Sequence, residues 1–197
     1  ITADASQSKT YGATDPTFAY TLTSGTLETG DAFSGTLSRT AGENVGNYPI
    51  AVGTVSAGAN YNLSFVADNF EITTKEITIT ADASQSKTYG ATDPTFTYTL
   101  TSGTLETGDA FTGTLSRTAG ENVGNYPIAV GTVSAGANYN LSFVADNFEI
   151  TTKAITITAD ADQKKTSGDV DPIFTYTITS GSLVSGDVFT GALSREV

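Results

Sequence analysis

The sequence predicts a mainly β protein in which small β-rich domains follow one another end to end in an elongated array. Two observations predict this fold class. The 197-residue chain repeats itself with a period of 78 residues, which is near the lower size of an independently folding domain. The repeat is also rich in threonine, with fourteen in the first 78 residues, and contains short segments in which apolar and polar residues alternate, as in half-buried strands.

The repeat sets the domain organisation. The opening motif Ile1–Ala5 returns at 79–83 and again at 157–161. The first two copies differ at three aligned positions, which are Ala19/Thr97, Ser34/Thr112 and Glu76/Ala154. We therefore expect a first complete unit at 1–75, a second complete unit at 76–153 and a truncated third unit at 154–197.

The second half of the first copy is predicted to form a three-stranded antiparallel meander over residues 47–74. Alternating apolar residues mark its strands at 48–52, 61–65 and 70–74. The turn chemistry of residues 67–69 makes the last two strands a predicted hairpin. Pro49 has no backbone N–H, so its strand is expected either at an edge or with that position turned outward.

The first half of the copy is less regular. Residues 17–23 alternate clearly and predict a strand. Residues 26–33 have no strand pattern and are expected to hold a turn or one short helix. In the second half, the parity of the apolar positions changes near Gly53, which predicts a β-bulge there.

The boundary between the first two units is expected at residues 74–76, where the apolar positions change from even to odd numbers. No glycine-, serine- or proline-rich linker separates the units there or at 152–154. We expect a semi-rigid rod in which each unit adds on the order of 30–40 Å, because strands of roughly ten residues rise about 3.3 Å per residue.

The composition argues against several functions. The chain has no cysteine and no histidine, so disulfides and thiolate metal sites are excluded and the commonest general base is missing. Its 21 acidic and 9 basic residues give a net charge of −12, which argues against nucleic acid and anionic membranes as partners. No apolar run is long enough to be inserted across a membrane. We predict no enzyme activity, no catalytic, cofactor-binding or metal-binding residues, and no cofactor.

Two kinds of residue pair are nevertheless candidates for a site. Tyr11-Gly12 and its copy Tyr89-Gly90 could form a stacking platform for a ligand, but we favour a tyrosine packed over a turn whose glycine needs a positive φ. Glu28 and Asp31 could act as an acid and a base, but nothing nearby in the sequence would raise a pKa, so we favour solvated acids.

Calcium at the domain boundaries is left open by the sequence. Four aspartates of the third unit lie close together in the chain, namely Asp160, Asp162, Asp169 and Asp171. Asp68 or Glu76 could contribute oxygen ligands at a boundary. None of them fits a known calcium loop, so no metal site is assigned. A lysine–asparagine isopeptide crosslink is also left open, and it would require burial of Lys9 or Lys75.

An ordered set of short motifs runs through the first copy: Lys9-Thr10-Tyr11-Gly12, Asp15-Pro16, Gly30-Asp31, Gly46-Asn47-Tyr48-Pro49-Ile50 and Ala59-Asn60-Tyr61-Asn62-Leu63. This set resembles the MBG-type repeat (YGX/YDG-like) of large bacterial surface adhesins. The second copy matches it throughout, whereas the third has Ser167 in place of the expected tyrosine. The resemblance covers the whole chain. It implies an extracellular β-rich unit, β-grasp-like or a small sandwich, that is used in tandem in adhesin stalks and has no catalytic residues.

We therefore predict structural spacer repeats of a bacterial cell-surface or secreted adhesin, which extend an adhesive region from the cell and serve cell adhesion or biofilm formation. Their partners would be neighbouring repeats of the same chain. The alternative is a module that binds surface glycans or a matrix polysaccharide weakly and gains avidity from its copies. Tyr20, Tyr48 or Tyr61 exposed in a groove would support that alternative, but all three lie on the predicted apolar face.

Overall fold

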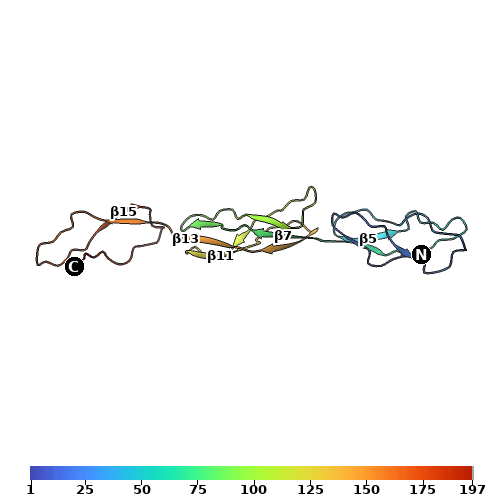
Figure 1. Ribbon diagram of the computed structural model, residues 1–197, viewed down its shortest axis with the longest axis horizontal. Coiled ribbons are helices and arrows are strands. Elements are labelled where there is room, and N and C mark those ends of the chain that lie inside the picture. Colours follow the sequence, from blue (N-terminus) through green and yellow to red (C-terminus); the bar gives the residue numbers. More distant parts are fainter. Residues whose placement is uncertain (197) are drawn as a thin grey trace.

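The computed structural model describes residues 1–196, and Val197, the last residue of the predicted third unit, lies outside the described residues. The expected mainly β fold is confirmed, because the described chain consists of short strands and connecting turns, without a helix. Figure 1 shows three units in line along the long axis, with the N-terminus in one end unit and the C-terminus in the other.

The second unit consists of two sheets. The three-stranded sheet has the order β12-β7-β9, with β7 at Lys75–Ala81, β9 at Tyr98–Ser102 and β12 at Tyr139–Val144. The four-stranded sheet has the order β10-β11-β13-β8, with β8 at Ser86–Thr88, β10 at Ser116–Arg117, β11 at Gly124–Ala129 and β13 at Asn147–Thr151.

Both sheets contribute to one hydrophobic core. Ile77, Ile79 and Ala81 alternate along β7 and are all buried, as the period of two predicts. Ile79 shares a cluster with Phe148 and Ile150 of β13, each of which is completely buried. The unit is thus a small sandwich, and the helix that a β-grasp fold requires is not found in the described part of the chain.

The first unit repeats this arrangement. Its strands are β1 at Thr2–Ala3, β2 at Ser8–Thr10, β3 at Tyr20–Thr21, β4 at Ser38–Arg39, β5 at Gly46–Ala51 and β6 at Asn69–Thr73. The four-stranded sheet has the order β2-β6-β5-β4, and β1 pairs with β3. Its core holds the equivalent residues, with Phe70 and Ile72 completely buried.

The third unit contains only one strand pair among its described residues. β14 at Thr156–Ala159 and β15 at Tyr176–Ser180 run antiparallel. Ile157 of β14 is 38% exposed, whereas Ile79 at the equivalent place in β7 is fully buried. The difference arises because β11 and β13, which cover Ile79 in the second unit, belong to the half of the repeat that follows its first 41 residues.

The predicted antiparallel meander is wrong. β5 pairs directly with β6, and residues 61–65 do not lie between them as a hairpin strand. In the second unit the equivalent segment is β12, which pairs in parallel with β7 in the opposite sheet, from Tyr139 opposite Lys75 to Val144 opposite Thr80. The turn at residues 145–146 therefore carries the chain from one sheet to the other. Alternation identified the strands, but it does not tell which partner each strand takes.

Three local expectations also need correction or refinement. β5 lies inside its sheet, between β6 and β4, so Pro49 is not on an edge; it stands opposite Asn69 at the end of the β5–β6 ladder, where a missing N–H disturbs little. Gly53 lies in a turn closed by the Val55 N–H and the Val52 carbonyl, 3.1 Å apart, and not in a bulge. Of the two structures considered for residues 26–33, the turn is present, with the Asp31 N–H bonded to the Glu28 carbonyl.

Candidate functional site: the joint between units

A single residue separates the strands of the first two units. β6 ends at Thr73 and β7 begins at Lys75, so only Thr74 lies between them. β6 lies in the four-stranded sheet of the first unit, whereas β7 is the central strand of the three-stranded sheet of the second. The chain therefore passes from one core to the next without a flexible linker, as Figure 1 illustrates.

The tyrosine–glycine turn of the first unit lies at this joint. The Tyr11 N–H donates to the Thr73 carbonyl at 2.9 Å, which fixes the turn beside the end of β6. Gly12 has a φ of +81°, as the structural interpretation of this pair expected. A Cβ at Gly12 would lie 2.2 Å from Glu106 Oε1 of the second unit, so glycine also permits the close approach of the two units.

Two tyrosines from different units meet on one carboxylate. Tyr11 Oη donates to Asp109 Oδ2 at 2.9 Å, and Tyr139 Oη donates to the same oxygen at 2.6 Å. The two rings pack edge to face, with centroids 5.4 Å apart and planes at 79°. Burial, together with the hydrogen bond to Asp109, raises the pKa of Tyr139 to about 12, and the bond to Asp109 also raises the pKa of Tyr11. Both phenols therefore remain protonated donors at neutral pH.

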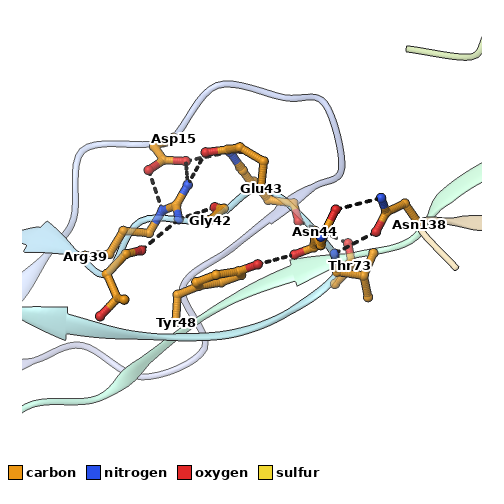
Figure 2. A network of polar contacts seen from close by, with 11 residues as sticks. Asp15, Arg39, Gly42, Glu43, Asn44, Tyr48, Thr73 and Asn138 are labelled. Atoms are coloured by element: carbon orange, nitrogen blue, oxygen red, sulfur yellow. Dashed lines mark hydrogen bonds and ion pairs between the residues drawn. The ribbon is translucent and has the colours of Figure 1, made fainter. Parts of the chain in front are cut away.

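Asn138 forms a second polar contact across the joint. Its Oδ1 accepts a hydrogen bond from the Val45 N–H at 3.0 Å, and its Nδ2 donates to Asn44 Oδ1 at 3.1 Å. Figure 2 shows this side chain reaching the loop that precedes β5. Its own carbonyl accepts the N–H of Lys75, the first residue of β7. Asn138 thus connects the loop of one unit to the first strand of the next.

An ion-pair cluster holds that loop in place. Arg39 donates from Nε and Nη2 to Asp15 at 2.6 and 2.9 Å, from Nη2 to Glu43 at 2.7 Å, and from Nη1 to the Gly42 carbonyl at 2.6 Å (Figure 2). The hydrogen bonds from Arg39 lower the pKa of Asp15 to about 2. Because Glu43 directly precedes Asn44, the cluster orders the part of the loop that meets Asn138.

Lys9 completes the cluster and bears on the isopeptide hypothesis. Its side chain is 4% exposed, and its Nζ contacts Asp15 at 2.7 Å and also Glu43. Burial opposes the charged form of Lys9, but the hydrogen bonds to Asp15 and Glu43 prevail and raise its pKa. Lys9 therefore has the burial that a crosslink needs, but it faces carboxylates and not an asparagine, and its ammonium form is not nucleophilic. Lys75 Nζ pairs with Glu106 at the joint.

Glu28 and Asp31 lie at the same positions of the first unit as Glu106 and Asp109 of the second. Asp31 accepts a hydrogen bond from Tyr61 Oη at 2.5 Å, as Asp109 does from Tyr139. The sequence predicted solvated acids at Glu28 and Asp31, and both are exposed. The contact of the equivalent turn in the second unit with Tyr11 of the first unit was not predicted. The signal was present, because Tyr-Gly and Gly-Asp recur at a fixed spacing with no linker between units.

Two of the acids considered for calcium, Asp171 and Glu76, are engaged with other groups. Asp171 pairs with Lys165 and Arg195, and Glu76 accepts hydrogen bonds from Asn140. Within residues 1–196, no three acidic residues come together in a way that could hold a metal ion. The same part of the chain also lacks a helix that is long and apolar enough to span a bilayer.

The second joint uses the same turn with different partners. Tyr89 Oη donates to Asp187 Oδ1 at 3.1 Å, and Gly90 has a φ of +83°. A Cβ at Gly90 would lie 2.4 Å from Val184 Cγ2, so Val184 takes the place that Glu106 holds at the first joint. A hollow of about 220 Å³ adjoins these residues, lined by Val123, Leu183 and others.

Of the three tyrosines that would support glycan binding, Tyr61 lines a hollow of about 270 Å³ in the first unit, whereas Tyr20 and Tyr48 are held by contacts within the unit. Tyr20 packs edge to face against Phe33, with centroids 5.7 Å apart. Tyr48 Oη donates to the Asn44 carbonyl at 2.7 Å, and the Arg39 guanidinium lies 5.1 Å from its ring centroid. Their rings therefore serve packing within the unit.

Comparison with known protein families gives one result. The family model described as MBG domain (YGX type) matches residues 1–71, 77–149 and 155–197. The three matches follow the three units, and the Tyr-Gly pairs at the joints fit the YGX description in the first two. No curated protein and no solved structure matches the chain.

Proposed function

Since the chain belongs to the MBG domain family of the YGX type, we propose that its units are spacer repeats in the stalk of a bacterial surface or secreted adhesin. MBG repeats are typical of adhesin-like surface proteins and are commonly extracellular. In this role the array acts by its length and stiffness. It extends an adhesive region away from the cell, and we propose no catalytic residue and no cofactor for it.

The observation that carries this proposal is the joint between the first two units. A stalk must hold the adhesive region at a distance from the cell, so neighbouring units must keep a fixed direction relative to each other. Thr74 alone links the two sheets, and Tyr11 and Asn138 make hydrogen bonds across the boundary on separate elements. Two separate anchors, in addition to the covalent link, restrict both bending and twisting.

The charge of the chain supports the same role. A net charge of −12 makes neighbouring stalks repel one another and keeps an extended array from associating. The neighbouring repeats of the chain are the proposed partners. A surface glycan or matrix polysaccharide is a weaker proposal, because Tyr20 and Tyr48 are engaged in packing within the unit.

Small-angle X-ray scattering of the chain tests the stalk. A matched control has a flexible Gly-Ser insertion after Thr74, which leaves both cores intact. We expect a rod-like profile for the natural chain, a broader distribution of dimensions for the control, and no change of the natural profile with calcium or a chelator. A compact profile, or one identical to the control, would contradict the spacer role, and specific retention on a glycan array would favour the binding module.

A further inference from the structure

We propose that Tyr11 and Tyr139 form an oxidative crosslinking site, at which a dityrosine bond can lock the first joint covalently. They form the one tyrosine–tyrosine ring pair in the described chain, and the two residues belong to different units. The inference follows from the geometry of the joint and would hold whether or not the array is a stalk.

The positions of the hydroxyl groups support the proposal. Dityrosine forms by a carbon–carbon bond between the ring atoms next to each hydroxyl. Because both hydroxyls bind Asp109 Oδ2, the hydroxyl ends of the two rings, next to the reactive carbons, converge on one point. The centroid separation of 5.4 Å requires only a small further approach, and an interplanar angle of 79° suits a product whose two rings are strongly twisted against each other.

Asp109 also assists the oxidation step. A phenol loses an electron more readily when its proton can leave at the same time, and a carboxylate bonded to the hydroxyl accepts that proton. Tyr11 and Tyr139 share this acceptor oxygen, so Asp109 takes up the proton of one phenol and releases it before it takes up the second. Tyr139 is only 7% exposed, whereas Tyr11 is half-buried, so oxidation would begin at Tyr11.

The reaction balances with a peroxide as oxidant. Each phenol gives up one electron and one proton to become a phenoxyl radical, and the two radicals couple at their ortho carbons. Each of these carbons then loses its hydrogen, which moves as a proton to the phenoxyl oxygen of the same ring and restores aromaticity. Hydrogen peroxide, acting through a haem peroxidase, takes up two electrons and two protons and becomes two water molecules. The chain loses two hydrogen atoms in total.

The chain supplies its own controls. Tyr89 holds the position of Tyr11 at the second joint and binds Asp187, but it faces no second tyrosine among the described residues. Tyr61 holds the position of Tyr139 in the first unit and binds Asp31, again without a tyrosine partner. Substituting either should leave an intramolecular Tyr11–Tyr139 bond unaffected.

The test treats the full chain at low concentration with hydrogen peroxide and a haem peroxidase. We expect dityrosine fluorescence in a chain that remains monomeric, a mass lower by two hydrogen atoms, and one linked pair of tryptic peptides, 10–39 with 118–153. Tyr11→Phe and Tyr139→Phe should each abolish the product, whereas Tyr89→Phe and Tyr61→Phe should not. Asp109→Asn should slow the reaction several-fold.

Repeating the reaction at high concentration shows whether the oxidant works, because half-exposed tyrosines then join different chains. If only such intermolecular products form, the proposal is wrong. It is equally wrong if the intramolecular product persists in the Tyr11→Phe chain. Neither result would alter the scattering profile that tests the stalk, so the two proposals fail independently.

Discussion

The second and third units begin with closely similar sequences but differ in what their first strand is packed against. In the second unit, Ile79 of β7 is covered by β11 and β13 and is fully buried. In the third, Ile157 at the same position is 38% exposed. The comparison teaches that the first half of the repeat forms its strand pair by itself, whereas burial of the core comes from the second half.

The ion-pair cluster follows the same division. Lys87 and Arg117 of the second unit have side chains that are 4% and 6% exposed, and both pair with Asp93 and Glu121. Lys165 and Arg195 pair with Asp171 in the third unit, but their side chains are 30% and 52% exposed. The contacts are similar, yet only the buried cluster should contribute much to stability.

The largest expected effect comes from the core. Phe148 is fully buried and packs against Phe96, with centroids 5.1 Å apart. Phe148→Ala should lower the free energy of unfolding of the second unit by about 3–5 kcal/mol, whereas Phe174→Ala, at the Phe96 position of the third unit, should cost less than about 1 kcal/mol. Calorimetry can distinguish the effects of the two substitutions, because the first unit is a nearly identical reference. Phe148→Ala should move the unfolding transition of the second unit to a lower temperature than that of the first. Equal effects of the two substitutions would contradict the comparison.

The buried cation should come next. The Arg117 guanidinium lies 5.3 Å from the Phe148 ring centroid and binds Asp93 through two nitrogens. Arg117→Gln leaves the carboxylates of Asp93 and Glu121 with only Lys87 as a cationic partner, so we expect a loss of about 2 kcal/mol in the second unit. Arg195→Gln should change the stability by no more than about 0.5 kcal/mol. Denaturant titration of each variant measures both values, and a larger effect at Arg195 would show that burial is not the deciding factor.

The same cluster predicts an acid-sensitive stability. The hydrogen bonds from Arg117 lower the pKa of Asp93 from its usual 3.8 to about 2. The contribution of ionised Asp93 to the free energy of unfolding is complete above about pH 4. It disappears as the pH falls through about 2, because the folded state then loses the ionised partner of Arg117. Melting temperatures at pH 5, 3 and 2 should therefore fall across this window. In Asp93→Asn the second unit should start lower and depend less on pH, and an unchanged slope would assign the loss to other groups.

The smallest expected effect is at the joint. The Val45 N–H donates to Asn138, whereas Val123, its counterpart in the second unit, is 53% exposed. Asn138→Ala removes two side-chain hydrogen bonds, to the Val45 N–H and to Asn44 Oδ1. The bond that protects the Val45 amide is worth about 1 kcal/mol, so exchange of that amide should accelerate roughly fivefold, toward the rate of Val123. Amide exchange followed by nuclear magnetic resonance compares the two residues in one sample. Unchanged protection of Val45 would mean that Asn138 does not hold the joint.

The sequence predicted the features that depend on local pattern. The repeat gave the number of units, and alternation located β7, with Ile77, Ile79 and Ala81 on its buried face. The positive φ of Gly12 also followed from its place beside Tyr11 in a turn. These properties are encoded within a few neighbouring residues.

Features that depend on distant partners could not be predicted in the same way. β12 and β13 are adjacent in sequence but lie in different sheets, and periodicity cannot distinguish this from a hairpin. The meeting of Tyr11 with Asp109 and Tyr139 joins residues about a hundred positions apart, and it depends on how two finished domains dock. Reasoning from single residues therefore identified Glu28 and Asp31 as solvated acids, and both are exposed in the first unit, but it did not foresee the contact between units at the equivalent Asp109.

The central claim is that contacts at the first joint hold two units in one relative orientation. The chain has no cysteine, so spin labels can be placed by two substitutions alone, at the exposed and equivalent positions Glu71→Cys and Glu149→Cys. Their distance distribution, measured by pulsed electron paramagnetic resonance, should be single and narrow. It should broaden when Tyr11→Phe and Asn138→Ala are added. A broad distribution in the otherwise natural chain, as wide as with a Gly-Ser insertion after Thr74, would contradict the account.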